Sequence, residues 1–122
     1  MANDFKRFTK PDVGTSTGAS ADAVYTVPAG AGSSALESIV IGITLANKSA
    51  TGITASVFLD NYDATNDVYI VKDATIPAGA SLEVMSGNKI VVMNNGTTGD
   101  VLRVEASSTS SLDATITVLE DV

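Results

Sequence analysis

The chain of 122 residues contains no histidine, cysteine or tryptophan, and aromatic residues make up only 5% of it. Without histidine or cysteine, the common nucleophile-and-base triads lack their base, and disulfide bridges are excluded. We therefore expect a non-enzymatic protein without a cofactor, which works through its surface by binding or assembling.

Charge is also scarce, because only 17% of the residues are charged and the formal net charge is −7. Such a chain is not expected to bind nucleic acid, since phosphate contacts need clustered lysine and arginine. No apolar run approaches the ~18 residues of a membrane span, so we expect no membrane partner. The first ten residues lack the apolar core of a signal peptide.

Short segments of alternating apolar and polar residues fill the rest of the chain. Alternation with a period of two, interrupted by turn residues, is typical of antiparallel sheets with one solvated face. The segments with this pattern are 23–27, 38–46, 53–59, 67–72, 81–85, 89–93, 100–106 and 112–120. They predict an all-β fold, a single antiparallel β-sandwich of about eight strands, either immunoglobulin-like or jelly-roll.

The alternation also predicts which side chains face the core. In segment 38–46 it places Ile39, Ile41, Ile43 and Leu45 on one face. Across the chain, the residues that we expect in the core are Ile41, Ile43, Val57, Leu102, Val104 and Ile116.

Residues 1–22 differ from the sandwich domain predicted for residues 23–122. Their first half is basic, and their second half has the Gly, Ser, Thr and Ala composition of a linker. We expect an extended N-terminal arm, whose partner-binding residues are Phe5, Lys6, Arg7, Phe8 and Lys10. The two phenylalanines either anchor in a groove of a partner or pack back on the edge of this domain. Removing residues 1–12 is expected to abolish docking and to leave the fold intact.

One loop carries the oxygen ligands that Ca²⁺ prefers. Asp60, Asp63 and Asp67 lie there together with two asparagines. The spacing departs from that of an EF-hand, and no glutamate closes the loop. We expect a solvated turn and no bound metal, with these three aspartates as the one calcium candidate.

Several strand and turn motifs resemble those of small virion structural proteins of tailed bacteriophages, in particular the marine cyanophage type. The motifs are Phe5-Lys6-Arg7-Phe8-Thr9, Val24-Tyr25-Thr26-Val27-Pro28-Ala29-Gly30, Ile76-Pro77-Ala78-Gly79-Ala80-Ser81-Leu82, Gly99-Asp100-Val101-Leu102-Arg103-Val104 and Val118-Leu119-Glu120. Together they span nearly the whole chain.

The resemblance implies a part of the virion, made in the cytoplasm of the host bacterium. It implies a capsid decoration (cement) protein, a homo-oligomer with a trimer favoured, that docks on the major capsid protein or on other virion proteins and stabilises the head. The alternatives are a neck, tail or fibre component, and a carbohydrate-binding module that touches the host surface through Tyr62 or Tyr69.

Overall fold

The computed structural model describes residues 3–62, 67–85 and 87–121. These residues form nine strands and one short 3₁₀ helix, η1 (Gly18–Ser20). The strands are β1 (Asn3–Lys10), β2 (Asp22–Thr26), β3 (Leu36–Asn47), β4 (Ile53–Asp60), β5 (Val68–Ile76), β6 (Ser81–Glu83), β7 (Ile90–Asn94), β8 (Val101–Ala106) and β9 (Leu112–Asp121). Each of the eight predicted segments coincides with a strand. No helix in this part of the chain is long and apolar enough to cross a membrane.

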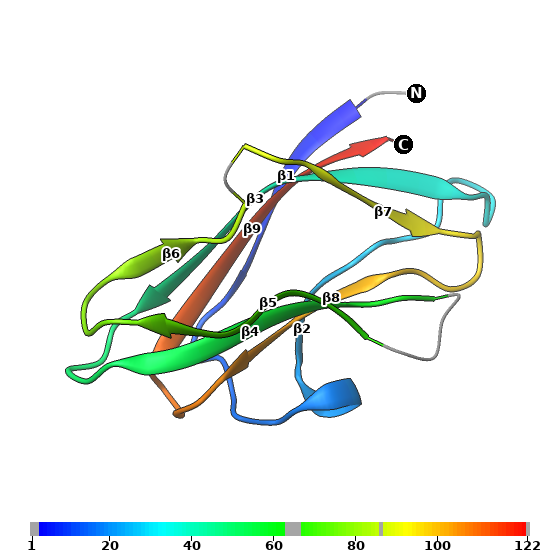
Figure 1. The fold of residues 1–122 in the computed structure, drawn as a ribbon. Helices are drawn as coiled ribbons and strands as arrows, with labels where there is room; N and C mark the ends of the chain where they lie inside the picture. Colours follow the sequence, from blue (N-terminus) through cyan, green and yellow to red (C-terminus); the bar gives the residue numbers. More distant parts are fainter. Residues whose placement is uncertain (1–2, 63–66, 86, 122) are drawn as a thin grey trace.

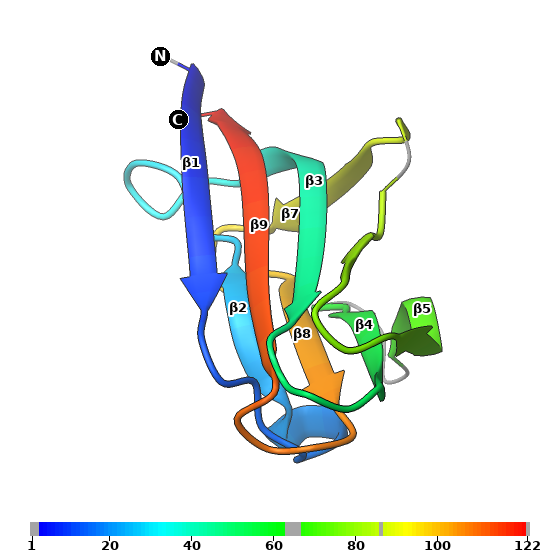
Figure 2. The ribbon, with the colours of Figure 1, turned by 90° about the vertical axis from the view of Figure 1, so that its left-hand side faces the viewer.

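The strands form two antiparallel sheets that pack against each other (Figure 1). Sheet A has the order β1-β9-β3-β6, and β7 also pairs with β3. Sheet B has the order β2-β8-β4-β5. Figure 2 shows β1, β9 and β3 side by side in front of sheet B. The predicted antiparallel β-sandwich is confirmed.

The order of the strands decides between the two predicted topologies. The pairs are nested along the chain: β4 with β5, around it β3 with β6 and β7, then β2 with β8, and outermost β1 with β9. Nested antiparallel pairs divided between two sheets are the arrangement of a jelly roll. The sandwich is therefore of the jelly-roll type.

The predicted N-terminal arm is instead a strand of the sandwich. All residues of β1 pair with β9, from Asn3 opposite Asp121 to Lys10 opposite Ala114. The following segment also belongs to the domain, because Val13 is fully buried and its N–H donates to the carbonyl of Leu112. An edge strand needs only one buried face and tolerates charge on the other, so its composition resembles that of a solvated arm.

Strand β3 contains a bulge that reverses its alternation. Its pairing with β9 shifts between Val40 and Gly42, and an extra residue in one strand moves the following side chains to the other face. Val40 faces the core before the bulge and Ile43 faces it afterwards. Ile39 consequently faces outward and Ile41 is only half-buried, so the core positions predicted for these two are wrong.

The other core predictions are confirmed, since Ile43, Val57, Leu102, Val104 and Ile116 are at most 1% exposed. The space between the sheets is filled mainly by aliphatic side chains. Burying each large one stabilises the fold by ~1.5–3 kcal/mol. The sandwich therefore holds together without disulfides and with few aromatic residues.

Candidate docking surface on sheet A

Strand β1 has one face toward the core and one toward solvent. Phe8 lies opposite the buried Ile116, and its ring packs on Tyr25 with centroids 4.6 Å apart and planes inclined by 38°. Phe5 points the other way and is 76% exposed. The two phenylalanines therefore have different roles. Phe8 packs on this domain, and of the two only Phe5 is free to contact a partner.

A buried carboxylate holds β1 and both sheets together. Glu120 on β9 is 1% exposed, and its Oε2 accepts a hydrogen bond of 2.7 Å from the Tyr25 hydroxyl of sheet B. That hydroxyl also lies 2.8 Å from Oγ of Ser38 on β3. Lys6 Nζ lies 2.9 Å from the other carboxylate oxygen, which no aligned hydrogen bond reaches. This ion pair compensates the burial of Glu120 and fixes Lys6 within the domain.

The network changes the protonation of its members. Burial, and then the hydrogen bond to Glu120, raise the pKa of Tyr25 above its ordinary value of 10.0. The short contact with Glu120, and then its charge, raise the pKa of Lys6 above 10.5. Tyr25 stays neutral and Lys6 stays charged over the physiological range, so the network is a permanent structural tie.

An exposed apolar row crosses the outer face of sheet A. Phe5 on β1 lies directly opposite Leu119 on β9, Leu119 opposite Ile39 on β3, and Ile39 opposite Val91 on β7. Directly opposed side chains on one face have Cβ atoms ~4.5–5.5 Å apart. Val91 is 55% exposed, and Leu119 and Ile39 are half-buried. We call these four residues the outer apolar row.

The row has opposite charges on its two sides. Strands β1 and β3 run in the same direction, since both are antiparallel to β9. Arg7 follows Phe5 by two residues, and Glu37 precedes Ile39 by two residues, so the exposed Arg7 and Glu37 lie on opposite sides of the row. Met93, opposite Glu37 and 40% exposed, extends the apolar surface on the acidic side.

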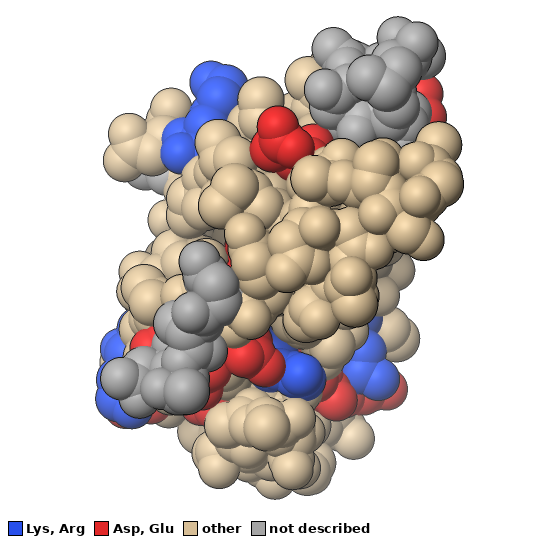
Figure 3. Space-filling model, turned by 90° about the vertical axis from the view of Figure 1, so that its right-hand side faces the viewer, with Lys and Arg blue, Asp and Glu red and all other residues tan. Residues whose placement is uncertain are grey.

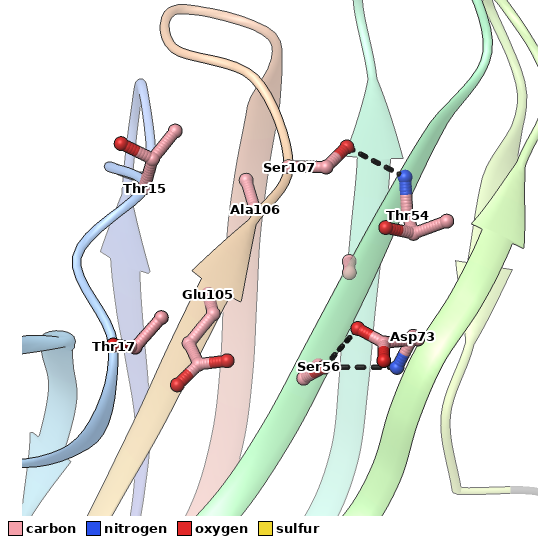
Figure 4. Close-up of a pocket in the computed structure, with 9 residues that line it drawn as sticks. Thr15, Thr17, Thr54, Ser56, Asp73, Glu105, Ala106 and Ser107 are labelled. Atoms are coloured by element: carbon pink, nitrogen blue, oxygen red, sulfur yellow. Dashed lines mark hydrogen bonds between the residues drawn. The ribbon is translucent and has the colours of Figure 1, made fainter.

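Sheet B carries a groove of about 230 Å³ lined by β4, β5, the end of β8 and the segment before η1 (Figure 4). Hydroxyl groups dominate its lining, and its carboxylates are Asp73 and Glu105. Both carboxylates already have partners: Glu105 accepts a hydrogen bond from the N–H of Gly18, and Asp73 bonds to the Ser56 hydroxyl. No aromatic side chain lines the groove. It can hold a small polar group but offers no surface for stacking a sugar.

The calcium candidate is not assembled as a site by the described residues. Asp60 accepts a 3.0 Å hydrogen bond from Nε of Arg103, which occupies this carboxylate. Asp63 lies outside the described residues, and Asp67 is the first residue described after that gap. Within residues 3–62, 67–85 and 87–121, no group of three acidic, histidine or cysteine side chains could hold a metal.

Two loops at the end of the sandwich on the right of Figure 1 are uncharged. These loops, 28–35 and 94–99, contain no Asp, Glu, Lys or Arg. Gly96 has a φ of 101°, and a Cβ there would lie 2.5 Å from the carbonyl oxygen of Ser33, so the two loops are in close contact. Figure 3 shows charged residues along the margins of a broad uncharged area on this side. No large apolar side chain is exposed in these loops, so sheet A remains the stronger candidate surface.

No family model matches the chain. The comparisons with curated proteins and with solved structures found no match either.

The partner-binding residues predicted from the sequence all lie on β1, whereas the outer apolar row also includes residues of β9, β3 and β7. Of the five predicted partner-binding residues, Phe5 and Arg7 face outward, Phe8 packs inward, Lys6 is paired with Glu120, and Lys10 is half-buried near the end of β1. Leu119, Ile39 and Val91 were not predicted. The available signal was the run of apolar residues on both faces of 39–43, because a strand that is apolar on both faces must cover something on each of them.

Proposed function

We propose that this protein is a non-enzymatic structural protein of a phage virion, and in the first place a capsid decoration protein that docks on the lattice of the major capsid protein and stabilises the head. The motif resemblance supports the virion assignment. The jelly-roll fold supports it at the level of analogy, since viral capsid proteins, but also lectins and cupins, use that fold. The resemblance favours a homo-oligomer, and a trimer among homo-oligomers.

The observation that carries the proposal is the exposed edge strand β1. Its residues Phe5 and Arg7 face outward, and its register on β9 and the Lys6–Glu120 ion pair hold them in place. A pre-organised edge binds without the entropic cost of ordering a flexible arm. The cationic Arg7 and Lys10 suit an acidic partner, and the free edge of β1 can accept a further strand.

Quantitative mass spectrometry of purified virions tests this function, by counting the chain against the major capsid protein. A copy number comparable with that of the capsid protein is the expected result. A much smaller number would move the protein to the neck, tail or a fibre, and complete absence would refute a virion role.

A binding assay on capsids that lack the protein tests the docking edge. We expect Arg7→Glu to weaken binding, whereas Lys72→Glu on β5 of the opposite sheet is the matched control and leaves binding unchanged. Equal effects of the two substitutions would show that only net charge matters and that β1 is not the docking edge.

The groove on sheet B favours one second candidate, a module that binds host-surface carbohydrate. A glycan array tests it with the wild-type protein and the Glu105→Gln variant. Tyr62 and Tyr69, the aromatic residues proposed for this role, do not line the groove. Glycan binding that is lost in Tyr69→Ala and retained in Glu105→Gln would therefore place a sugar site outside the groove.

A further inference from the structure

The outer apolar row raises the question of what covers it. Three of the five exposed large apolar side chains of the described residues, Phe5, Val91 and Met93, lie on this one face of sheet A. With strands ~4.8 Å apart, a row across four strands is about 14 Å long. Contiguous apolar surface of this kind, bordered by charge, is typical of a protein–protein contact.

We infer that a second copy of this chain covers the outer apolar row, in a two-fold symmetric pair whose axis runs along the row. The inference rests on the proposed function only in taking sheet A as a contact surface, and it names the partner on that surface. The pair takes the place of the trimer that the resemblance favours. A two-fold interface must be complementary to itself, and the residues beside the row meet this condition.

The complementarity comes from the charges on the two sides of the row. Rotation about an axis along the row lays each row residue over its own copy and brings the Arg7 side of one chain over the Glu37 side of the other. Rotation about an axis parallel to the strands instead lays Phe5 over Val91 and brings the Arg7 sides of both chains together. Opposite charges attract and like charges repel across an interface, so the charges select the first arrangement.

This pair also has a consequence for docking. An axis along the row keeps β1 of one chain above β1 of the other, so both basic edges lie on the same side of the pair. The pair therefore presents two copies of Lys10 and of the free backbone edge of β1 to one surface, and two linked contacts bind more tightly than one. The apolar row holds the copies together, and the edges remain free for a lattice.

Sedimentation equilibrium between roughly 1 µM and 1 mM tests the pair, since a small interface gives a weak dimer. We expect the wild-type chain to dimerise and Val91→Ser to weaken the dimer at least about tenfold, because it removes an exposed apolar contact of the row. Val68→Ser is the matched control, since Val68 is exposed to a similar extent, 51%, on β5 of sheet B. A strict monomer, a trimer, or equal effects of both variants would overturn the inference.

Charge reversal tests the orientation. Arg7→Glu and Glu37→Lys are each expected to weaken the dimer about tenfold, and the double variant is expected to restore it. Single variants that dimerise like the wild-type chain would overturn the proposed axis.

Cross-linking provides a second test of the orientation, because the chain has no cysteine of its own. Packed sheets lie ~10 Å apart, so a bis-maleimide of about that length should join two chains carrying Phe5→Cys, and equally two chains carrying Val91→Cys. Cross-links that form only between a Phe5→Cys chain and a Val91→Cys chain would show the other axis.

The two proposals fail in distinguishable ways. A dimer with the expected cross-links, combined with absence from virions, would refute the virion role and leave the pair intact. Abundance in virions combined with a strict monomer would refute the pair and point to a capsid protein on the apolar row.

Discussion

At the scale of single residues, the most constrained group in the molecule is the carboxylate of Glu120. Acidic side chains are rarely fully buried unless they are paired, and this one meets Tyr25 from sheet B and Lys6 from β1. Removing one partner of a buried charge leaves it uncompensated, which costs more than the contact itself contributes. The Glu120 carboxylate therefore connects the N-terminal strand and both sheets.

Stability should fall in alkali because of Tyr25. Its raised pKa means that the folded protein keeps a proton that the unfolded chain loses above pH 10.0. The contribution is present below that pH and is lost as the pH rises toward the folded pKa. Tyr25→Phe should lower the free energy of unfolding by ~1–3 kcal/mol at neutral pH, since Glu120 loses a donor, and should reduce its decline between pH 9 and 11.

Urea denaturation at several pH values measures this effect. The control is Tyr69→Phe, because Tyr69 is 39% exposed on β5 and touches neither Glu120 nor Ser38. Its alkaline decline should match that of the wild-type protein. A decline in Tyr25→Phe as steep as in the control would show that Tyr25 does not cause the pH dependence.

Two isoleucines on β3 should differ sharply in their contribution to stability. Ile43 is fully buried, and Ile43→Ala should cost ~2–4 kcal/mol through lost burial and the cavity left behind. Ile41 lies at the bulge and is half-buried, so Ile41→Ala should cost less than ~1.5 kcal/mol. Chemical denaturation compares the two variants, and equal costs would mean that the bulge lies elsewhere.

At the scale of elements, β1 is a structural strand before it is a docking edge. Without it, β9 becomes the unpaired edge of sheet A, and Glu120 loses the Lys6 ammonium. The sequence-based expectation that residues 1–12 can be removed without harm to the fold is therefore replaced. We expect their deletion to destabilise the domain and to promote aggregation through the exposed edge of β9.

Point variants separate the two faces of β1 without deleting it. Phe8→Ala should lower the free energy of unfolding by ~2–4 kcal/mol, because the ring packs on Tyr25 and the core. Phe5→Ala, 76% exposed, should change it by less than ~0.5 kcal/mol. Thermal unfolding of dilute protein measures both, and a similar loss in the two variants would contradict the assigned faces.

At the scale of the whole molecule, the nested pairing brings the two ends of the chain together. Asn3 pairs with Asp121, and the labelled termini lie side by side in Figure 1. A circular permutant should therefore fold, with the old ends joined by a short Gly/Ser linker and new ends between Ser108 and Thr109. Both of these residues are exposed in the turn between β8 and β9.

The permutant keeps every strand pair. The entropic cost of closing a loop rises only slowly with the length of that loop, so moving the chain ends changes stability little. We expect its melting temperature to stay within about 10 °C of the wild-type value, as measured by circular dichroism. A permutant opened in the middle of β3, between Ile43 and Thr44, is the control that should fail to fold. Failure of the first permutant as well would show that the connection between β8 and β9 has a role beyond joining the strands.

The sequence by itself determined where eight of the nine strands lie and how most of them face. The alternation of 101–106 and 112–118 correctly gave the buried Leu102, Val104 and Ile116, because period-two patterning is a local property of a strand with one solvated face. It did not show that residues 3–10 form a strand of the sandwich, and the role of Phe5 as a contact residue stays a prediction.

Only the tertiary structure decided the pairing partners and what depends on them. The bulge at Ile41, the strand formed by residues 3–10, the jelly-roll order and the row from Phe5 to Val91 all arise between segments far apart in the chain. A local pattern records which residues avoid water, but not which strand lies beside them. Register and neighbours are fixed when the sheets assemble, and the docking surface exists only once they have.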